Sequence, residues 1–162
     1  MFHAIRWCVG LLVICFSLFS HAQDFEAVKR AAERGDAAAQ YALGVMIEKN
    51  GGNNPDKAAA EAAKWYRKAA EQGYANAQVI LDAVSALKRA APLNKDAIQI
   101  DPEAVKRLRK LAEQGDAAAQ FYLGVVYLDR HNGQDDVLEA SKWLRKASEN
   151  GHTVAKNLLD GK

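Results

Sequence analysis

Hydrophobic residues recur every three or four positions along most of the chain after residue 23, as they do on one face of an α-helix. Phe25, Val28 and Ala31 share such a face, and so do Leu43 and Ile47 further on. The pattern predicts helices at about 24–34, 36–48, 56–72, 103–114, 116–130, 135–150 and 152–159. A further helix is expected after residue 74, and the sequence therefore indicates an all-α protein.

The same pattern of residues repeats along the chain. Residues 112–125 match residues 32–45 at eleven of fourteen positions, a weaker copy occupies 70–83, and a trace of a fourth lies at 148–159. One glycine of each copy falls at the same place, and these are Gly35, Gly73, Gly115 and Gly151, spaced by 38, 42 and 36 residues. A period of roughly 20–50 residues is typical of stacked structural repeats.

These glycines predict the turns. Glycine adopts the left-handed conformation at a helix C-terminus without a Cβ clash. Asp36 and Asp116 follow directly and can each cap the next helix. Two helices joined by one or two residues fold back on each other, so each copy is expected to form a helical hairpin.

Two further glycines occur inside predicted helices, where glycine costs about 1 kcal/mol relative to alanine. Gly44 and Gly124 occupy equivalent positions in the two strong copies. Their recurrence indicates close packing against the second helix of the hairpin. We expect Trp65 and Trp143 to fill the space beside them.

The middle copy departs from this pattern. Asp82 replaces the helix glycine, and Arg107 stands where the other copies have tryptophan. The segment 90–102 holds two prolines and no helical period, so it is interpreted as an enlarged loop. This unit is expected to be the least tightly packed.

The first residues have the pattern of a secretory signal peptide. Residues 1–6 carry one positive charge, 7–19 form an apolar run, and Ser20-His21-Ala22 places small residues before an expected cleavage after Ala22. An uncleaved anchor is the alternative, but the run is shorter than the roughly 20 residues that span a bilayer. A lipoprotein signal fits less well, because Ile14 precedes Cys15.

Cleavage would leave residues 23–162 in the periplasm or outside the cell, with no stable membrane insertion. Both cysteines, Cys8 and Cys15, would be removed, so the mature chain could form no disulfide. Loss of Arg6 lowers the net charge from +2 to +1, from 21 Lys and Arg against 20 Asp and Glu. A near-neutral exported chain has no net field to gather phosphates, which argues against nucleic acid.

Residues 35–45 with 62–73, and 115–125 with 140–151, share G-D-A-A-A-Q-[YF]-x-L-G-V and then A-x-K-W-x-R-K-A-[AS]-E-x-G. This pattern resembles the Sel-one-like repeat family, a relative of the tetratricopeptide repeat, in its exported bacterial type. The resemblance implies a right-handed α/α superhelix, or solenoid, over 23–162. It would contain three full helix pairs from about 36, 74 and 116 with a half unit at each end. The apolar face of the last helix, formed by Ala155, Leu158 and Leu159, is expected to seal the end of the stack.

In proteins of this kind the first helix of each pair lines a concave groove. Carried over by position, the groove-facing residues would be Tyr41, Val45, Glu48, Val79, Ala83, Phe121, Val125 and Leu128. Tyr41 and Phe121 would be the aromatic anchors for a protein or peptide partner. The alternative stays open, because an apolar stripe on a helix is more often core.

The mature sequence offers little catalytic chemistry. His131 and His152 have no second ligand at metal spacing, and no serine elbow or phosphate-binding glycine loop is present. We therefore expect no enzyme activity, metal or cofactor. Three hypotheses remain: a binding scaffold, a β-lactam-binding or β-lactamase-like enzyme of the cysteine-rich repeat type, and a regulator of an envelope enzyme or sensor. The missing mature cysteines weaken the second.

Overall fold

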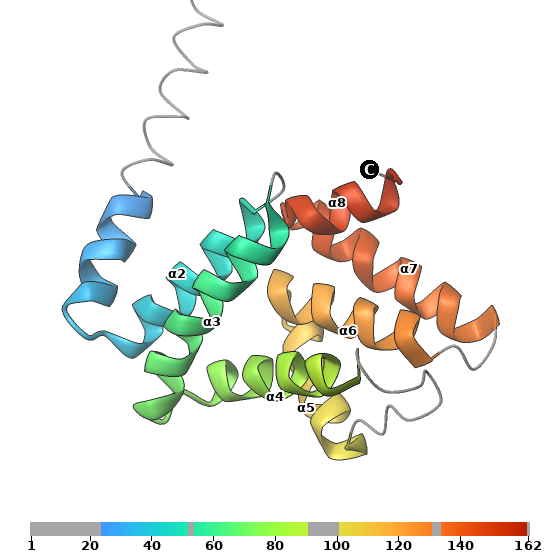
Figure 1. The fold of residues 1–162 in the computed structure, drawn as a ribbon, viewed down its shortest axis with the longest axis horizontal. Helices are drawn as coiled ribbons and strands as arrows, with labels where there is room; N and C mark the ends of the chain where they lie inside the picture. The colour runs from blue at the N-terminus through green and yellow to red at the C-terminus, as the bar shows by residue number, and fades with distance from the viewer. Residues whose placement is uncertain (1–23, 52–53, 91–100, 131–133, 162) are drawn as a thin grey trace, which may run out of the picture.

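The computed structural model describes residues 24–51, 54–90, 101–130 and 134–161, and these ranges form helices without a strand (Figure 1). A helical segment at 24–33 comes first. It is followed by α2 (Ala37–Lys49), α3 (Pro55–Glu71), α4 (Ala75–Ala90), α5 (Pro102–Glu113), α6 (Ala117–Arg130), α7 (Gln134–Glu149) and α8 (Thr153–Leu159). The predicted all-α solenoid is confirmed. The predicted signal segment and residues 91–100 of the predicted enlarged loop at 90–102 lie outside the described residues.

The turns between helices form as the glycine pattern predicts. Gly35, Gly73, Gly115 and Gly151 all have positive φ, between 81° and 98°. Asp36 caps α2 by accepting from the Ala39 N–H at 2.7 Å. Asp135 and Asp136 lie within the first turn of α7. Each glycine turn therefore reverses the chain within a few residues.

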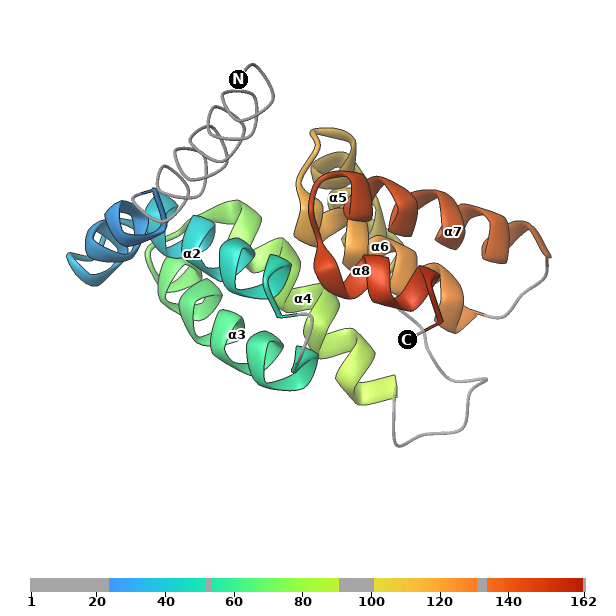
Figure 2. The ribbon, with the colours of Figure 1, turned by 90° about the horizontal axis from the view of Figure 1, so that it is seen from above.

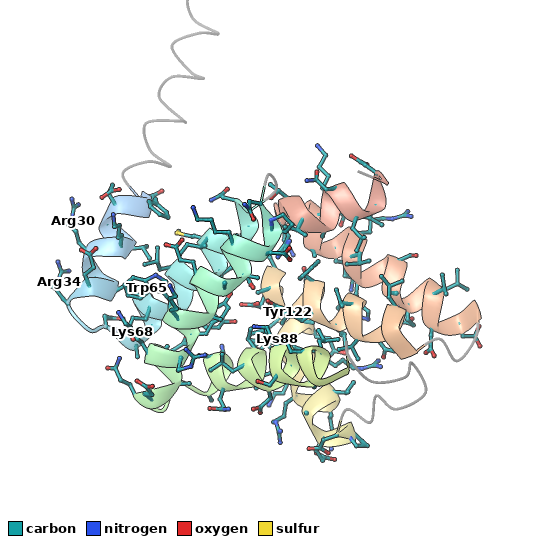
Figure 3. The ribbon with its side chains drawn as sticks, viewed as in Figure 1. Arg30, Arg34, Trp65, Lys68, Lys88 and Tyr122 are labelled. Carbon is teal, nitrogen blue, oxygen red and sulfur yellow. The ribbon has the colours of Figure 1, made fainter. Side chains whose placement is uncertain are left out.

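Hairpin packing depends on the two helix glycines, but their partners are not the predicted tryptophans. A Cβ on Gly44 would lie 2.5 Å from Tyr66 Cε1, and one on Gly124 would lie 2.7 Å from Leu144 Cγ. Tyr66 and Leu144 each follow the tryptophan by one residue, which turns them by about 100° toward the glycine. Trp65, next to Tyr66, is half-buried with the Lys68 ammonium over its ring (Figure 3).

The middle hairpin replaces this glycine contact with charges. Asp82 and Arg107, the two departures from the repeat pattern, lie 3.8 Å apart as an ion pair that is largely exposed. Helices α4 and α5 contact each other less extensively than do the two helices of either other hairpin. The expectation that this unit is the least tightly packed agrees with that contact pattern.

Two buried glutamines connect consecutive hairpins. Gln120 donates to the Ala112 carbonyl at 3.0 Å and accepts from the Asn150 amide at 2.8 Å. Gln40 makes the same pair of bonds in the first repeat. The equivalent Gln78 is exposed and bonds Asp82 instead. Each buried glutamine thus ties the end of the preceding helix to the end of its own hairpin.

The stack curls back on itself. Helix α2 contacts both α6 and α8, and α8 lies beside the end of the first hairpin (Figures 1 and 2). The Thr153 hydroxyl donates to the Lys49 carbonyl across this contact. The inner face of the curve is therefore largely closed by helix contacts. Of the three residues predicted to seal the stack, Ala155 is buried, but Leu158 and Leu159 are 48% and 40% exposed.

Substitution of Gly44 by alanine should destabilise the protein by about 1–3 kcal/mol, because the added methyl group overlaps the buried Tyr66 ring. The measurement is the free energy of unfolding in urea. In a Tyr66→Ala background the same substitution should be neutral or stabilising, because alanine favours the helix. Equal effects in both backgrounds would contradict the proposed contact.

Gln120→Ala should cost about 1–3 kcal/mol, because it leaves buried partners without hydrogen bonds. Gln78→Ala, at the equivalent but exposed position, is the matched control and should cost less than about 0.5 kcal/mol. Thermal unfolding of both variants tests the difference. Similar losses of stability in the two variants would mean that burial of the glutamine does not increase its contribution to stability.

Candidate functional site

Tyrosines on the inner face of the curve bond carboxylates, and the bonds from Tyr41 and Tyr122 cross between repeats. The Tyr41 hydroxyl donates to Asp116 Oδ2 at 2.7 Å, while Asp116 Oδ1 caps α6 by accepting from the Ala119 N–H at 2.8 Å. The Tyr41 ring packs on Tyr66 and Tyr74, with centroids 5.5 and 5.2 Å away. Because Asp116 lies 75 residues after Tyr41, this bond joins the first repeat to the third.

Glu48 forms the second such link. Its side chain is buried, with 4% of the residue exposed. One oxygen accepts from the Tyr66 hydroxyl at 2.8 Å, and the other accepts from the Tyr122 hydroxyl of α6. Tyr122 lies near the centre of the molecule, between the first and third hairpins (Figure 3). The carboxylate thus bridges two hairpins.

Burial perturbs the acid–base chemistry of this cluster. Loss of solvent raises the pKa of Glu48 from 4.5 to about 7, although hydrogen bonds from Tyr122 and Tyr66 act in the opposite direction. Burial and the neighbouring carboxylates also raise the pKa values of Tyr41, Tyr66 and Tyr122. These tyrosines therefore remain hydrogen-bond donors near neutral pH.

A pocket of about 340 Å³ opens beside Glu48. Its walls come from α2, α3, α6 and α8, which are far apart in the chain. They are formed by Glu48, Pro55, Asp56, Ala59, Phe121, Tyr122, His152, Val154 and Leu158. Most of these side chains are apolar. The pocket is thus a mostly apolar cavity with two carboxylates, a phenol and an imidazole in its wall, created by the return of α8 to the first hairpin.

His152 forms one wall and is 1% exposed. Its Nδ1 caps α8 by accepting from the Ala155 N–H at 3.3 Å, and its ring stacks on Phe121 with centroids 4.4 Å apart. Burial and, to a smaller degree, Lys49 lower the pKa of His152 to about 4. The neutral ring therefore carries its proton on Nε2, an atom with no hydrogen-bond partner among the described residues.

The structure divides the residues predicted to face a groove. Tyr41, Glu48 and Ala83 are buried, and Val45, Val79 and Leu128 are partly buried against the core. Val125 is half-buried. Phe121 lines the pocket with Glu48. The groove-facing expectation was therefore wrong for Tyr41 and Ala83, which belong to the core, because α6 packs against both α2 and α4. Binding by the other residues stays a prediction.

His152, Val154 and Leu158 were not predicted from the sequence to be site residues. All three lie at or within α8, and their place beside Glu48 depends on the curvature of the whole stack. The apolar face of α8 was visible in the sequence, but its neighbour was not.

The described residues contain no group of three His, Cys, Asp or Glu side chains that could hold a metal ion. Across the same ranges, every helix is too short or too polar to cross a membrane.

The fold defines the class of protein, an α-solenoid built from helical hairpins. A family model of the Sel1 repeat matches residues 37–74 and 117–152, which contain the α2–α3 and α6–α7 hairpins with their following turns. The chain is thus a Sel1-like repeat protein. The middle hairpin, where Asp82 and Arg107 depart from the pattern, falls outside the matched ranges. Comparisons with curated proteins and with solved structures return no match.

Glu48 and His152 should have opposite effects on stability as the pH changes. The folded state binds the Glu48 proton more tightly than the unfolded chain, so this residue lowers stability as pH rises from about 4.5 to about 7. His152 binds its proton less tightly when folded, so it raises stability from about pH 4 to 6.5. The stability gain of Glu48→Gln over the wild type should therefore grow by about 3 kcal/mol between pH 4.5 and 7.

Urea unfolding at several pH values measures this difference. His152→Asn keeps a capping oxygen and removes the titration, so its stability relative to the wild type should fall as the pH rises from 4 to 6.5. Parallel pH profiles for the wild type and both variants would contradict the assigned pKa shifts.

Proposed function

We propose that the protein is a non-catalytic scaffold that binds a partner protein or peptide through the pocket beside Glu48 and its rim. Sel1 repeats are generally protein–protein interaction modules and typically non-catalytic. The observation that carries the proposal is the pocket itself, where the first hairpin, α6 and α8 meet around a mostly apolar cavity. Its volume is near the lower end of the roughly 300–1,000 Å³ found for ligand sites, which suits one inserted side chain.

The rim of the pocket supports a protein partner. Leu158 belongs to the pocket wall and is 48% exposed, and the neighbouring Leu159 is 40% exposed. Adjacent exposed leucines on a terminal helix are a feature of surfaces that another protein covers. A partner segment lying along α8 would bury both and could place one side chain in the pocket.

The proposal includes a location outside the cytoplasm. It rests on the signal-like residues 1–22, which are outside the described ranges. In the periplasm or outside the cell, such a scaffold could assemble with an envelope enzyme or sensor and regulate it. The repeat fold with its exposed binding rim is compatible with that role.

A photo-crosslinking residue at position 158 tests the scaffold proposal. Leu158 lies on the pocket rim, while the exposed Lys106 on α5 provides a control position away from the pocket. With extract from the source cells, we expect the variant at 158 to form a defined adduct and the variant at 106 to form none. Gel mobility and mass spectrometry identify the adduct. Adducts at both positions, or at neither, would refute a partner at this site.

A further inference from the structure

Glu48 is a buried carboxylate without a cation. Among the residues that the structure describes, it forms no ion pair, and both of its bonds come from neutral tyrosine hydroxyls. Buried acids in proteins are normally paired or bind metal ions, because an isolated buried charge is costly. Glu48 is also part of the pocket wall, so a cation from outside could supply the missing charge.

Asp56 and the aromatic part of the pocket wall also favour a cation, whereas the Nε2–H of His152 is a donor and does not. Asp56, an exposed acid in the first turn of α3, adds a second carboxylate, and no lysine or arginine belongs to the wall. Phe121 and Tyr122 form an edge-on pair with centroids 5.4 Å apart. One face of Phe121 is covered by His152, and an ammonium over an uncovered aromatic face would be attracted through the ring quadrupole.

We infer that the pocket binds a lysine side chain of the partner polypeptide, with its ammonium beside Glu48. This inference rests on the proposed function and specifies which partner residue enters the pocket. The aliphatic stem of lysine would pack on Val154 and Leu158, since long charged side chains bury their stems on apolar surface. Asp56 at the wall would add attraction for the incoming positive charge.

The hydrogen bonding of Glu48 favours lysine over arginine. Each carboxylate oxygen already accepts one tyrosine hydroxyl, and an oxygen has room for a second donor. The paired geometry that an arginine fork prefers needs the remaining lone pair of both oxygens to face the pocket at the same time. A compact ammonium needs a single lone pair and can turn its other two donors elsewhere.

Binding of an ammonium should also release a proton. The groups around Glu48 that carry or can gain charge are Tyr41, Lys49, Asp56, Tyr66, Asp116, Tyr122 and His152. The tyrosines stay neutral because their pKa values are raised, and His152 is neutral above its pKa of about 4. Glu48, with a pKa of about 7, is thus the group here that loses its proton when a cation arrives.

Two synthetic peptides test the inference by isothermal titration calorimetry at pH 8: acetyl-Ala-Ala-Lys-Ala-Ala-amide and the same peptide with norleucine for lysine. Norleucine keeps the linear alkyl chain and lacks the charge. We expect the lysine peptide to bind about tenfold more tightly. Glu48→Gln should abolish this preference, whereas Glu113→Gln, on an exposed part of α5 outside the pocket wall, should preserve it.

The pH dependence provides a second readout. The affinity for the lysine peptide should rise between pH 6 and 8 in the wild type, and in titrations at pH 6 to 7 the binding heat should vary with the ionisation enthalpy of the buffer. In Glu48→Gln both effects should vanish. If that variant does not fold, as judged by circular dichroism, Asp56→Asn replaces it, and the lysine preference should then fall by a few-fold and depend less on salt.

Equal affinity for the two peptides, or no measurable binding of either at millimolar concentration, would overturn the inference. A lysine preference that survives Glu48→Gln and Asp56→Asn would also overturn it. These results are separable from failure of the scaffold proposal. An adduct at position 158 without a lysine preference would support the scaffold proposal and refute the lysine inference. A lysine preference without an adduct would support lysine binding by the pocket and refute the scaffold proposal.

Discussion

The hydrogen bonds that Glu48 accepts from Tyr66 and Tyr122 are the interaction on which the rest of the structure depends. The Tyr66 bond joins α2 to α3 within the first hairpin, and the Tyr122 bond holds α2 against α6 and so helps set how tightly the stack curls. The bond from Tyr41 to Asp116 acts at the same junction. This curvature brings α8 beside the first hairpin and creates the pocket. The burial that raises the Glu48 pKa is a consequence of the same arrangement.

The two strong repeats and the weak one show how a repeat can change without losing its fold. In the strong repeats a helix glycine accepts a large side chain, and a buried glutamine ties neighbouring hairpins. The middle repeat has neither feature, and an exposed ion pair between Asp82 and Arg107 joins its helices. Because each unit also packs on its neighbours, the stronger repeats on both sides can support it.

Much of the fold could be predicted from the sequence, because its determinants are local. Turn glycines, capping aspartates and helical spacing specify hairpins within some 40 residues, and the observed helix ends agree within one or two positions. The choice of Trp65 rather than Tyr66 as the partner of Gly44 was wrong, because adjacent residues on an amphipathic helix can both be large and apolar. The site was harder to predict, since the burial of Glu48 and His152 results from contacts between distant repeats that no local pattern encodes.

The bond from Thr153 to the Lys49 carbonyl connects residues that are 104 positions apart. An open array of repeats can fray from either end, since each unit meets its neighbours alone. A closed array has no loose terminus at this junction, so separation of the last helix exposes the first hairpin as well. The molecule would then unfold in one cooperative event. Folding would be slowed, because it requires contacts between segments that are far apart in the sequence.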